Sequence, residues 1–144
     1  MRAVWPENRV LSVRLSVHDF VDGGLTLEDT SQVGIWLKDL GVDILDCSGG
    51  GAVPEAHGAI GNRTAEQPDM AGVLRSSAGL PIMAVGGITD PAHAESIIAE
   101  NKADIVLLGR ELMRDPHWAF TAAKTLGADA RPVLANQYGF FVGG

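Results

Sequence analysis

Short apolar runs rich in β-branched residues alternate along the chain with segments of helical periodicity. Runs that are apolar on both faces are typical of parallel strands covered by helices. The starts of successive runs lie 34, 38 and 23 residues apart, which leaves room for a helix in each connection. The pattern therefore predicts an α/β fold with four parallel strands. These strands are expected at Val10–Ser16, Ile44–Cys47, Ile82–Val85 and Ile105–Leu108.

Local signals mark where the predicted helices begin and end. Thr26 precedes the acidic pair Glu28-Asp29 and is expected to cap the first helix, which ends near Gly41. The other three helices are expected over Asp69–Ala78, from Asp90-Pro91, and from about Asp115-Pro116 to Leu126. No linker or low-complexity stretch interrupts this order, so the chain is expected to form one region.

Composition and charge exclude several classes of protein. Apolar residues make up 46% of the 144 positions, which is too many for a disordered chain. Eleven basic and 18 acidic side chains give a formal net charge of −7, which opposes generic nucleic-acid binding. No apolar run is long enough to span a bilayer, and no secretory leader opens the chain. The single cysteine can form neither an internal disulfide nor a usual zinc site. A cytoplasmic protein without a metal is expected.

Glycines follow the predicted third and fourth strands, at the edge of the sheet where parallel α/β folds bind ligands. Gly86 and Gly87 come after one strand, and Gly109 with Arg110 after the next. Glycine lets backbone N–H groups approach an anion, and the guanidinium adds a positive fork for phosphate oxygens. The sequence therefore favours a phosphate site. The alternative is that the glycines serve only tight turns and that Arg110 pairs with Glu111 or Asp115.

The length of the chain limits the choice of fold. A closed (β/α)₈ barrel usually needs roughly 250 residues, and this chain holds about four βα units. Four such units form either a small open sheet or half of a barrel. Two consecutive glycine-led loops are typical of the phosphate site after strands 7 and 8 of many barrels, which favours the half-barrel. The pattern of residues 1–7 is typical of the end of a helix followed by a turn, with no helix start before it, so these residues are expected to continue a larger fold.

Polar side chains in the first two strands are further candidates. Arg14 lies inside an apolar strand, where a charge is costly unless it is paired. Its spacing is consistent with two interpretations. Arg14 either faces a ligand or forms an ion pair with a carboxylate of a neighbouring strand, such as Asp46, and the sequence favours neither. Ser48 follows the second strand, is able to donate a hydrogen bond and precedes three glycines that allow close approach of a ligand. Cys47 is interpreted as a buried structural residue, because no histidine partner is placed by the sequence.

A long connection over residues 52–68 is a candidate for functional residues because of its length. Its polar members are His57, Asn62, Arg63 and Gln67. No two of the four histidines stand three or four positions apart, so a helical metal pair is not expected. His18 and His57 follow strands and either line a pocket mouth or lie on the surface.

Four segments carry a family signature: Val13–Ser16, Gly41–Gly50, Ala84–Ile88 and Ala103–Pro116. They resemble the Old Yellow Enzyme family, FMN-dependent NAD(P)H:flavin oxidoreductases and ene-reductases built on a (β/α)₈ barrel. The resemblance runs from about Val4 to Tyr138 and is nearest to the bacterial, thermophilic-like branch. It implies that residues 1–144 form the C-terminal half of the barrel, strands five to eight, with 139–144 as a disordered tail.

The resemblance also implies roles for individual residues. Arg14 would face the flavin ring near N1 and the C2 carbonyl, where positive charge stabilises the anionic reduced flavin. Ser48 and Gly50 would lie along the ribityl-phosphate arm. The phosphate would be held by Gly86, Gly87, Gly109 and Arg110. The implied cofactor is FMN, the reductant is NAD(P)H, and the substrate of the intact family is an activated alkene.

Other groups of the family have no counterpart in this sequence. Its substrate-binding histidine pair, the residue that tunes the flavin potential, the glutamine on the pyrimidine edge and the proton-donating tyrosine all lie upstream of the matched part. No catalytic residue is therefore assigned. The subgroup's Gln-Tyr-x-Arg-Gly run reads Gln137–Phe141 here, with Phe140 in the place of the arginine that reaches into a neighbouring subunit.

These observations lead to one expected function and one alternative. We expect the C-terminal portion of an FMN-binding oxidoreductase that is inactive alone, with its open face covered by self-association or by a missing N-terminal half. The alternative is a non-redox phosphate-binding βα module that acts on sugar or ribose phosphates.

Overall fold

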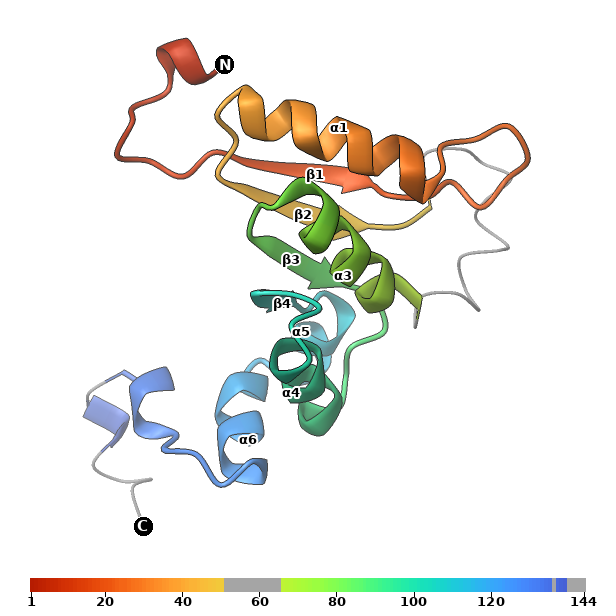
Figure 1. Ribbon diagram of the computed structural model, residues 1–144. Coiled ribbons are helices and arrows are strands. Elements are labelled where there is room, and N and C mark those ends of the chain that lie inside the picture. The colour runs from red at the N-terminus through yellow and green to blue at the C-terminus, as the bar shows by residue number, and fades with distance from the viewer. Residues whose placement is uncertain (51–65, 136, 140–144) are drawn as a thin grey trace.

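Four parallel strands form one sheet in which the order along the chain is also the order in space (Figure 1). The computed structural model describes residues 1–50, 66–135 and 137–139. The strands are β1 (Ser12–Ser16), β2 (Ile44–Ser48), β3 (Ile82–Val85) and β4 (Ile105–Leu107). All three neighbouring pairs are parallel. The strand predictions are thus confirmed, with boundaries that differ by one or two residues.

Helices follow every strand. They are α1 (Leu27–Asp39), α3 (Gln67–Ala78), α4 (Pro91–Ala99), α5 (Arg110–Arg114) and α6 (Trp118–Thr125), with the short 3₁₀ turns η1 (Arg2–Val4) and η4 (Arg131–Val133). The predicted cap of α1 is confirmed, because the Thr26 hydroxyl accepts from the Asp29 N–H while the Asp29 carboxylate accepts from the Thr26 N–H. Asp90 caps α4 without a reciprocal bond, and its carboxylate accepts from the Ala92 N–H at 3.3 Å.

The region after β4 differs from the sequence prediction. The helix expected from about Asp115-Pro116 to Leu126 corresponds to α6, but the sequence did not predict α5, which begins at Arg110, directly after Gly109, and ends at Arg114. Asp115 is extended, with φ −127° and ψ 93°. A residue before proline is disfavoured in the helical region, so the Asp115-Pro116 pair separates α5 from α6. The proline that suggested a helix start thus acts here as a stop for the preceding turn.

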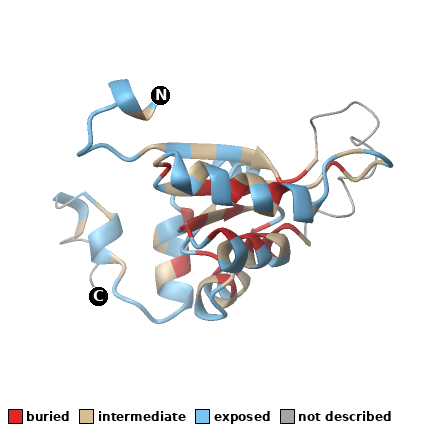
Figure 2. Cartoon of the chain, turned by 45° about the horizontal axis from the view of Figure 1, so that its top comes forward, coloured by how far each residue is buried: buried red, intermediate tan, exposed pale blue. Residues whose placement is uncertain are grey.

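One face of the sheet packs against the helices. Leu45, Ile82 and Ala84 are completely buried there, and the helix residues Ala71 and Leu74 cover them with no exposed surface of their own. Figure 2 shows that the buried residues concentrate where the helices meet the sheet, while both terminal segments are exposed. Burial of these apolar side chains is the main contribution to the stability of this layer.

The opposite face of the sheet, called the open face below, is formed by every second residue of each strand. It consists of Ser12, Arg14, Ser16, Ile44, Asp46, Ser48, Met83, Val85, Ile105 and Leu107. The register places Arg14, Asp46, Met83 and Ile105 side by side in one row. Of these ten residues only Asp46 is buried, and Ile105 is 45% exposed.

A sheet with helices on one face and an open second face is the arrangement expected for four consecutive units of a (β/α)₈ barrel. The predicted fold class is therefore confirmed. Of the predicted tail, only Gly139 lies within the described residues, where its N–H donates to the Ala135 carbonyl at 3.3 Å. No helix in the described part of the chain is long and apolar enough to cross a membrane.

Candidate functional site

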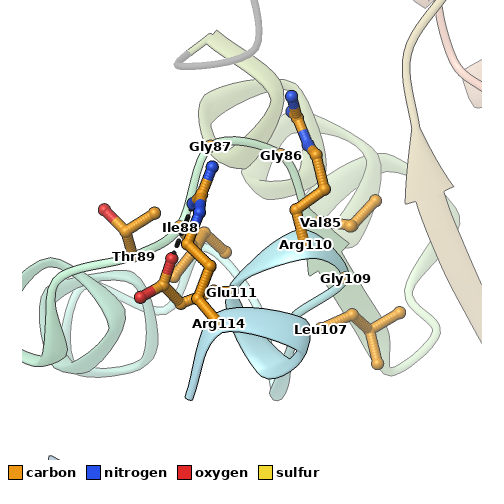
Figure 3. A pocket seen from close by; sticks show the side chains of 10 residues that line it. All are labelled: Val85, Gly86, Gly87, Ile88, Thr89, Leu107, Gly109, Arg110, Glu111 and Arg114. Atoms are coloured by element: carbon orange, nitrogen blue, oxygen red, sulfur yellow. Dashed lines mark hydrogen bonds and ion pairs between the residues drawn. The ribbon is translucent and has the colours of Figure 1, made fainter. Parts of the chain in front are cut away.

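The loops after β3 and β4 meet in one pocket at the carboxyl edge of the sheet (Figure 3). Its volume is about 290 Å³. It is lined by Val85, Gly86, Gly87, Ile88, Thr89, Leu107, Gly109, Arg110, Glu111 and Arg114. The structure thus brings together four of the seven site residues that the sequence predicted, from two loops separated by more than twenty residues of chain.

The backbone of the β3 loop uses the freedom of glycine. Gly86 has φ 131° and Gly87 has φ 64°, a region that other residues rarely adopt. These two residues therefore place backbone and no side chain at their positions in the pocket lining. Across the pocket, a Cβ built on Gly109 would meet no atom within 4 Å, so the space above this position is open.

Two arginines from α5 supply the charge of the pocket. Arg110 is exposed and has no hydrogen bond or ion pair with any residue that the structure describes. Arg114, one helical turn later, donates to the Glu111 carboxylate at 2.8 Å. In Figure 3 both side chains extend from α5 in the same direction, and only that of Arg114 is joined to a carboxylate. The alternative in which Glu111 neutralises Arg110 is therefore not observed.

Arg114 and Thr89 are pocket residues that the sequence reasoning did not select. The spacing of four between Arg110 and Arg114 was the available signal for the former, because residues four apart share one face of a helix. That signal requires a helix starting at Arg110, and the sequence predicted a loop there. No comparable signal marked Thr89.

Arg14 lies on the open face and not beneath the helices. Its Nε donates to Asp46 Oδ2 at 2.7 Å, directly across the β1–β2 pair. The side chain of Arg14 remains 60% exposed. The ion pair that one interpretation predicted is therefore present, and Arg14 is also exposed on the open face, while its role toward a ligand stays a prediction.

Ser48 and Gly50 lie at the same edge but do not line the pocket. Ser48 ends β2, opposite Ser16. Gly50 has φ 66°, and its N–H donates to the His18 carbonyl at 2.9 Å. Its own carbonyl accepts from the Ser16 hydroxyl at 3.2 Å. Both backbone groups of Gly50 thus tie the end of β2 to β1.

Two further candidates have structural partners, and a third is buried. Gln67 is buried and donates to the Gly49 carbonyl at 3.2 Å, which fixes the start of α3 against the end of β2. His18 accepts from the Phe20 N–H through Nδ1 at 2.8 Å and stacks on the Phe20 ring. Burial raises the pKa of the Cys47 thiol to about 12, with a further contribution from the charge of Asp46. Cys47 is buried, as the sequence predicted, and its structural role stays an interpretation. His57, Asn62 and Arg63 lie outside the described residues.

Comparison with known proteins decides the family. The NADH:flavin oxidoreductase / NADH oxidase family matches residues 2–129. The chain belongs to this family. It is also 40% identical over 140 residues to the NADPH dehydrogenase of Bacillus subtilis (strain 168). That alignment covers 97% of this chain and 40% of the relative, so the chain spans less than half the length of that NADPH dehydrogenase.

Membership of the flavin oxidoreductase family confirms the resemblance drawn from the four sequence segments. The expectation of FMN with NAD(P)H as reductant is confirmed at the level of the family. A non-redox phosphate-binding module is not favoured by these matches. The described residues fit the phosphate end of FMN, because the pocket combines two consecutive glycines, whose backbone an anion can approach, with an exposed arginine that no described carboxylate neutralises.

Proposed function

We propose that this chain is the C-terminal portion of an FMN-binding, NAD(P)H-dependent oxidoreductase of the ene-reductase type. The pocket between the β3 and β4 loops carries the proposal, because it offers a dianion an exposed guanidinium and an open glycine backbone. When bound, FMN would accept a hydride from NAD(P)H and pass it to an activated alkene. The physical contribution of the chain is to bind and orient that cofactor.

Four residues would hold the phosphate. Gly86 and Gly87 carry no side chains, so that an anion can approach the backbone of these two residues closely. Gly109 leaves space on the other side of the pocket, and Arg110 supplies a permanent positive charge with a planar set of donors. The pocket volume of about 290 Å³ is sufficient for a phosphate group with part of its ribityl chain.

Three residues would serve the rest of the cofactor. Arg14 is exposed on the open face and would stand beside the flavin ring, where its charge favours the reduced anion. Ser48, at the end of β2, would donate a hydrogen bond to the ribityl chain. Gly50 would leave the path along the edge of the sheet unobstructed while holding β1 and β2 together.

The activity of a whole flavin oxidoreductase is not expected from this chain alone. No described residue is assigned to orient a substrate carbonyl or to donate a proton. The open face and the outer edges of β1 and β4, which pair with no further strand among the described residues, also require a cover, which a second copy or the remainder of a barrel would supply. A cytoplasmic location stays a prediction.

Titration with FMN tests the proposal. The purified chain is expected to quench FMN fluorescence saturably, and Arg110→Gln is expected to weaken binding by about tenfold or more, the typical effect of losing a charged hydrogen bond. Arg131→Gln is the matched control, because Arg131 pairs with Asp129 and does not line the pocket. Absence of saturable binding, or equal losses in the two variants, would overturn the proposal.

A further inference from the structure

Asp46 is a buried carboxylate on the otherwise unburied open face. It is 8% exposed, and its Oδ2 accepts from Arg14. Its Oδ1 is buried and has no hydrogen-bond partner among the described residues. The other neighbours in its row, Met83 and Ile105, are apolar. Burying a half-satisfied carboxylate costs free energy that an apolar side chain would not. Stability of the sheet therefore does not account for Asp46.

Arg14 is held at one point only. Its Nε donates to Asp46, whereas neither terminal amino group donates to any residue described in the structure. The two residues are direct register partners on β1 and β2, so the sheet itself fixes their separation. A planar guanidinium anchored through Nε keeps both terminal amino groups in a defined plane. These groups remain available to a ligand on the open face.

We propose that Asp46 is a positioning residue that acts through Arg14 and sets how strongly the chain prefers reduced over oxidised FMN. This inference rests on the proposed function. The Asp46 carboxylate orients the guanidinium of Arg14 toward the flavin ring, and its negative charge offsets part of the positive charge of Arg14. The first effect favours the reduced flavin, and the second moderates that preference.

The two effects predict different results for two variants. Reduction of FMN by dithionite adds two electrons and one proton and leaves an anionic flavin. Asp46→Asn keeps an acceptor for Arg14 Nε but removes the negative charge. We expect the ratio of affinities, reduced over oxidised, to rise about tenfold, which corresponds to ~30 mV for a two-electron couple. Asp46→Ala also removes the acceptor, so Arg14 loses its orientation and the ratio is expected to stay near or below the wild-type value.

Anaerobic titration of both flavin states, with and without dithionite, measures these ratios. Asp104→Asn is the matched control, because Asp104 also pairs with an arginine but lies before β4, at the opposite edge of the sheet. It is expected to lower stability and leave the ratio unchanged. If the wild-type chain binds FMN but the ratio is the same in all variants, the role of Asp46 is overturned and the proposed function is not. Failure of the wild-type chain to bind FMN in either state would overturn the proposed function and this inference with it.

A second readout needs no flavin. In the nuclear magnetic resonance spectrum of the free chain, the Arg14 Nε–H is expected to exchange slowly with solvent in the wild type and in Asp46→Asn. In Asp46→Ala the exchange is expected to become fast. An equally slow Arg14 Nε–H in Asp46→Ala would show that another group orients the guanidinium and would overturn the proposal.

Discussion

Asp104 joins three elements through one carboxylate. Arg75 of α3 donates to it twice, at 2.8 and 3.0 Å, and the Ile82 N–H of β3 donates at 2.9 Å. The hydrogen bonds from Arg75 are the main reason that the pKa of Asp104 lies below its ordinary value of 3.8, and the Ile82 N–H adds to the effect. The charged carboxylate therefore stabilises the junction of α3, β3 and β4.

This pKa shift gives a pH-dependent prediction. Because the pKa is lower in the folded chain, the stabilisation is complete above the unfolded pKa and is lost as the pH falls through the folded one. Asp104→Asn should lower the free energy of unfolding by roughly 1 kcal/mol at neutral pH, since the bonds are partly exposed. Urea unfolding should show that the difference from wild type shrinks at about pH 3. A difference of equal size at both pH values would contradict this account.

At the same scale, the roles of single charged residues were only partly predictable. The sequence left Arg14 between an ion pair and a ligand-facing position, because strand register depends on the whole sheet and not on local sequence. Arg110 was assigned to a phosphate loop from the glycines around it. The sequence did not predict that Glu111 pairs with Arg114 and not with Arg110, because that pairing depends on the helix α5.

The elements themselves were largely predictable from local physics. Apolar runs gave all four strands, and the Thr26 and Asp90 caps gave the starts of α1 and α4. The short helix α5 was missed because five residues carry too little periodicity to be recognised. The order of the strands in space followed from the βα connections, whereas the pocket required the two loops to be placed in three dimensions.

The packing of α1 on α3 depends on Gly34. A Cβ at this position would lie 2.9 Å from the Ala78 Cβ, which is too close without a shift of one helix. Gly72 is the matched control within α3, because a Cβ there meets its nearest neighbour, Lys102, at an ordinary 3.4 Å. Gly34→Ala should therefore destabilise the chain on the order of 1 kcal/mol, despite its better helix propensity.

Gly72→Ala should be neutral or stabilise by up to about 1 kcal/mol, since it gains helix propensity without a clash. Thermal unfolding of the two variants and the wild type measures the difference. If Gly34→Ala were at least as stable as Gly72→Ala, the close approach of α1 and α3 at Gly34 would be refuted.

At the scale of the whole molecule, the open face is the feature that most needs a partner. Ile105 on this face is 45% exposed, at the edge of β4 that pairs with no further described strand, and the other apolar residues of the face are half-buried. We predict that the isolated 15.1 kDa chain self-associates and that Ile105→Glu weakens the association about tenfold or more, because a buried unpaired charge is costly.

Val73→Glu is the control for this experiment, since Val73 is 50% exposed on a helix and not on the open face. Size-exclusion chromatography with light scattering measures the mass of each species. A wild-type chain that stays monomeric with a cooperative melt would contradict the prediction, and so would equal effects of the two variants.

We propose that the loops after β3 and β4 bind the phosphate of FMN, and the other proposed roles depend on this binding. It is tested most directly by comparing the affinities of the chain for FMN and for riboflavin, which lacks the phosphate. The wild-type chain is expected to bind FMN with about tenfold or more higher affinity than riboflavin, and Arg110→Gln is expected to remove most of this difference. Equal affinity of the wild-type chain for the two flavins would contradict it.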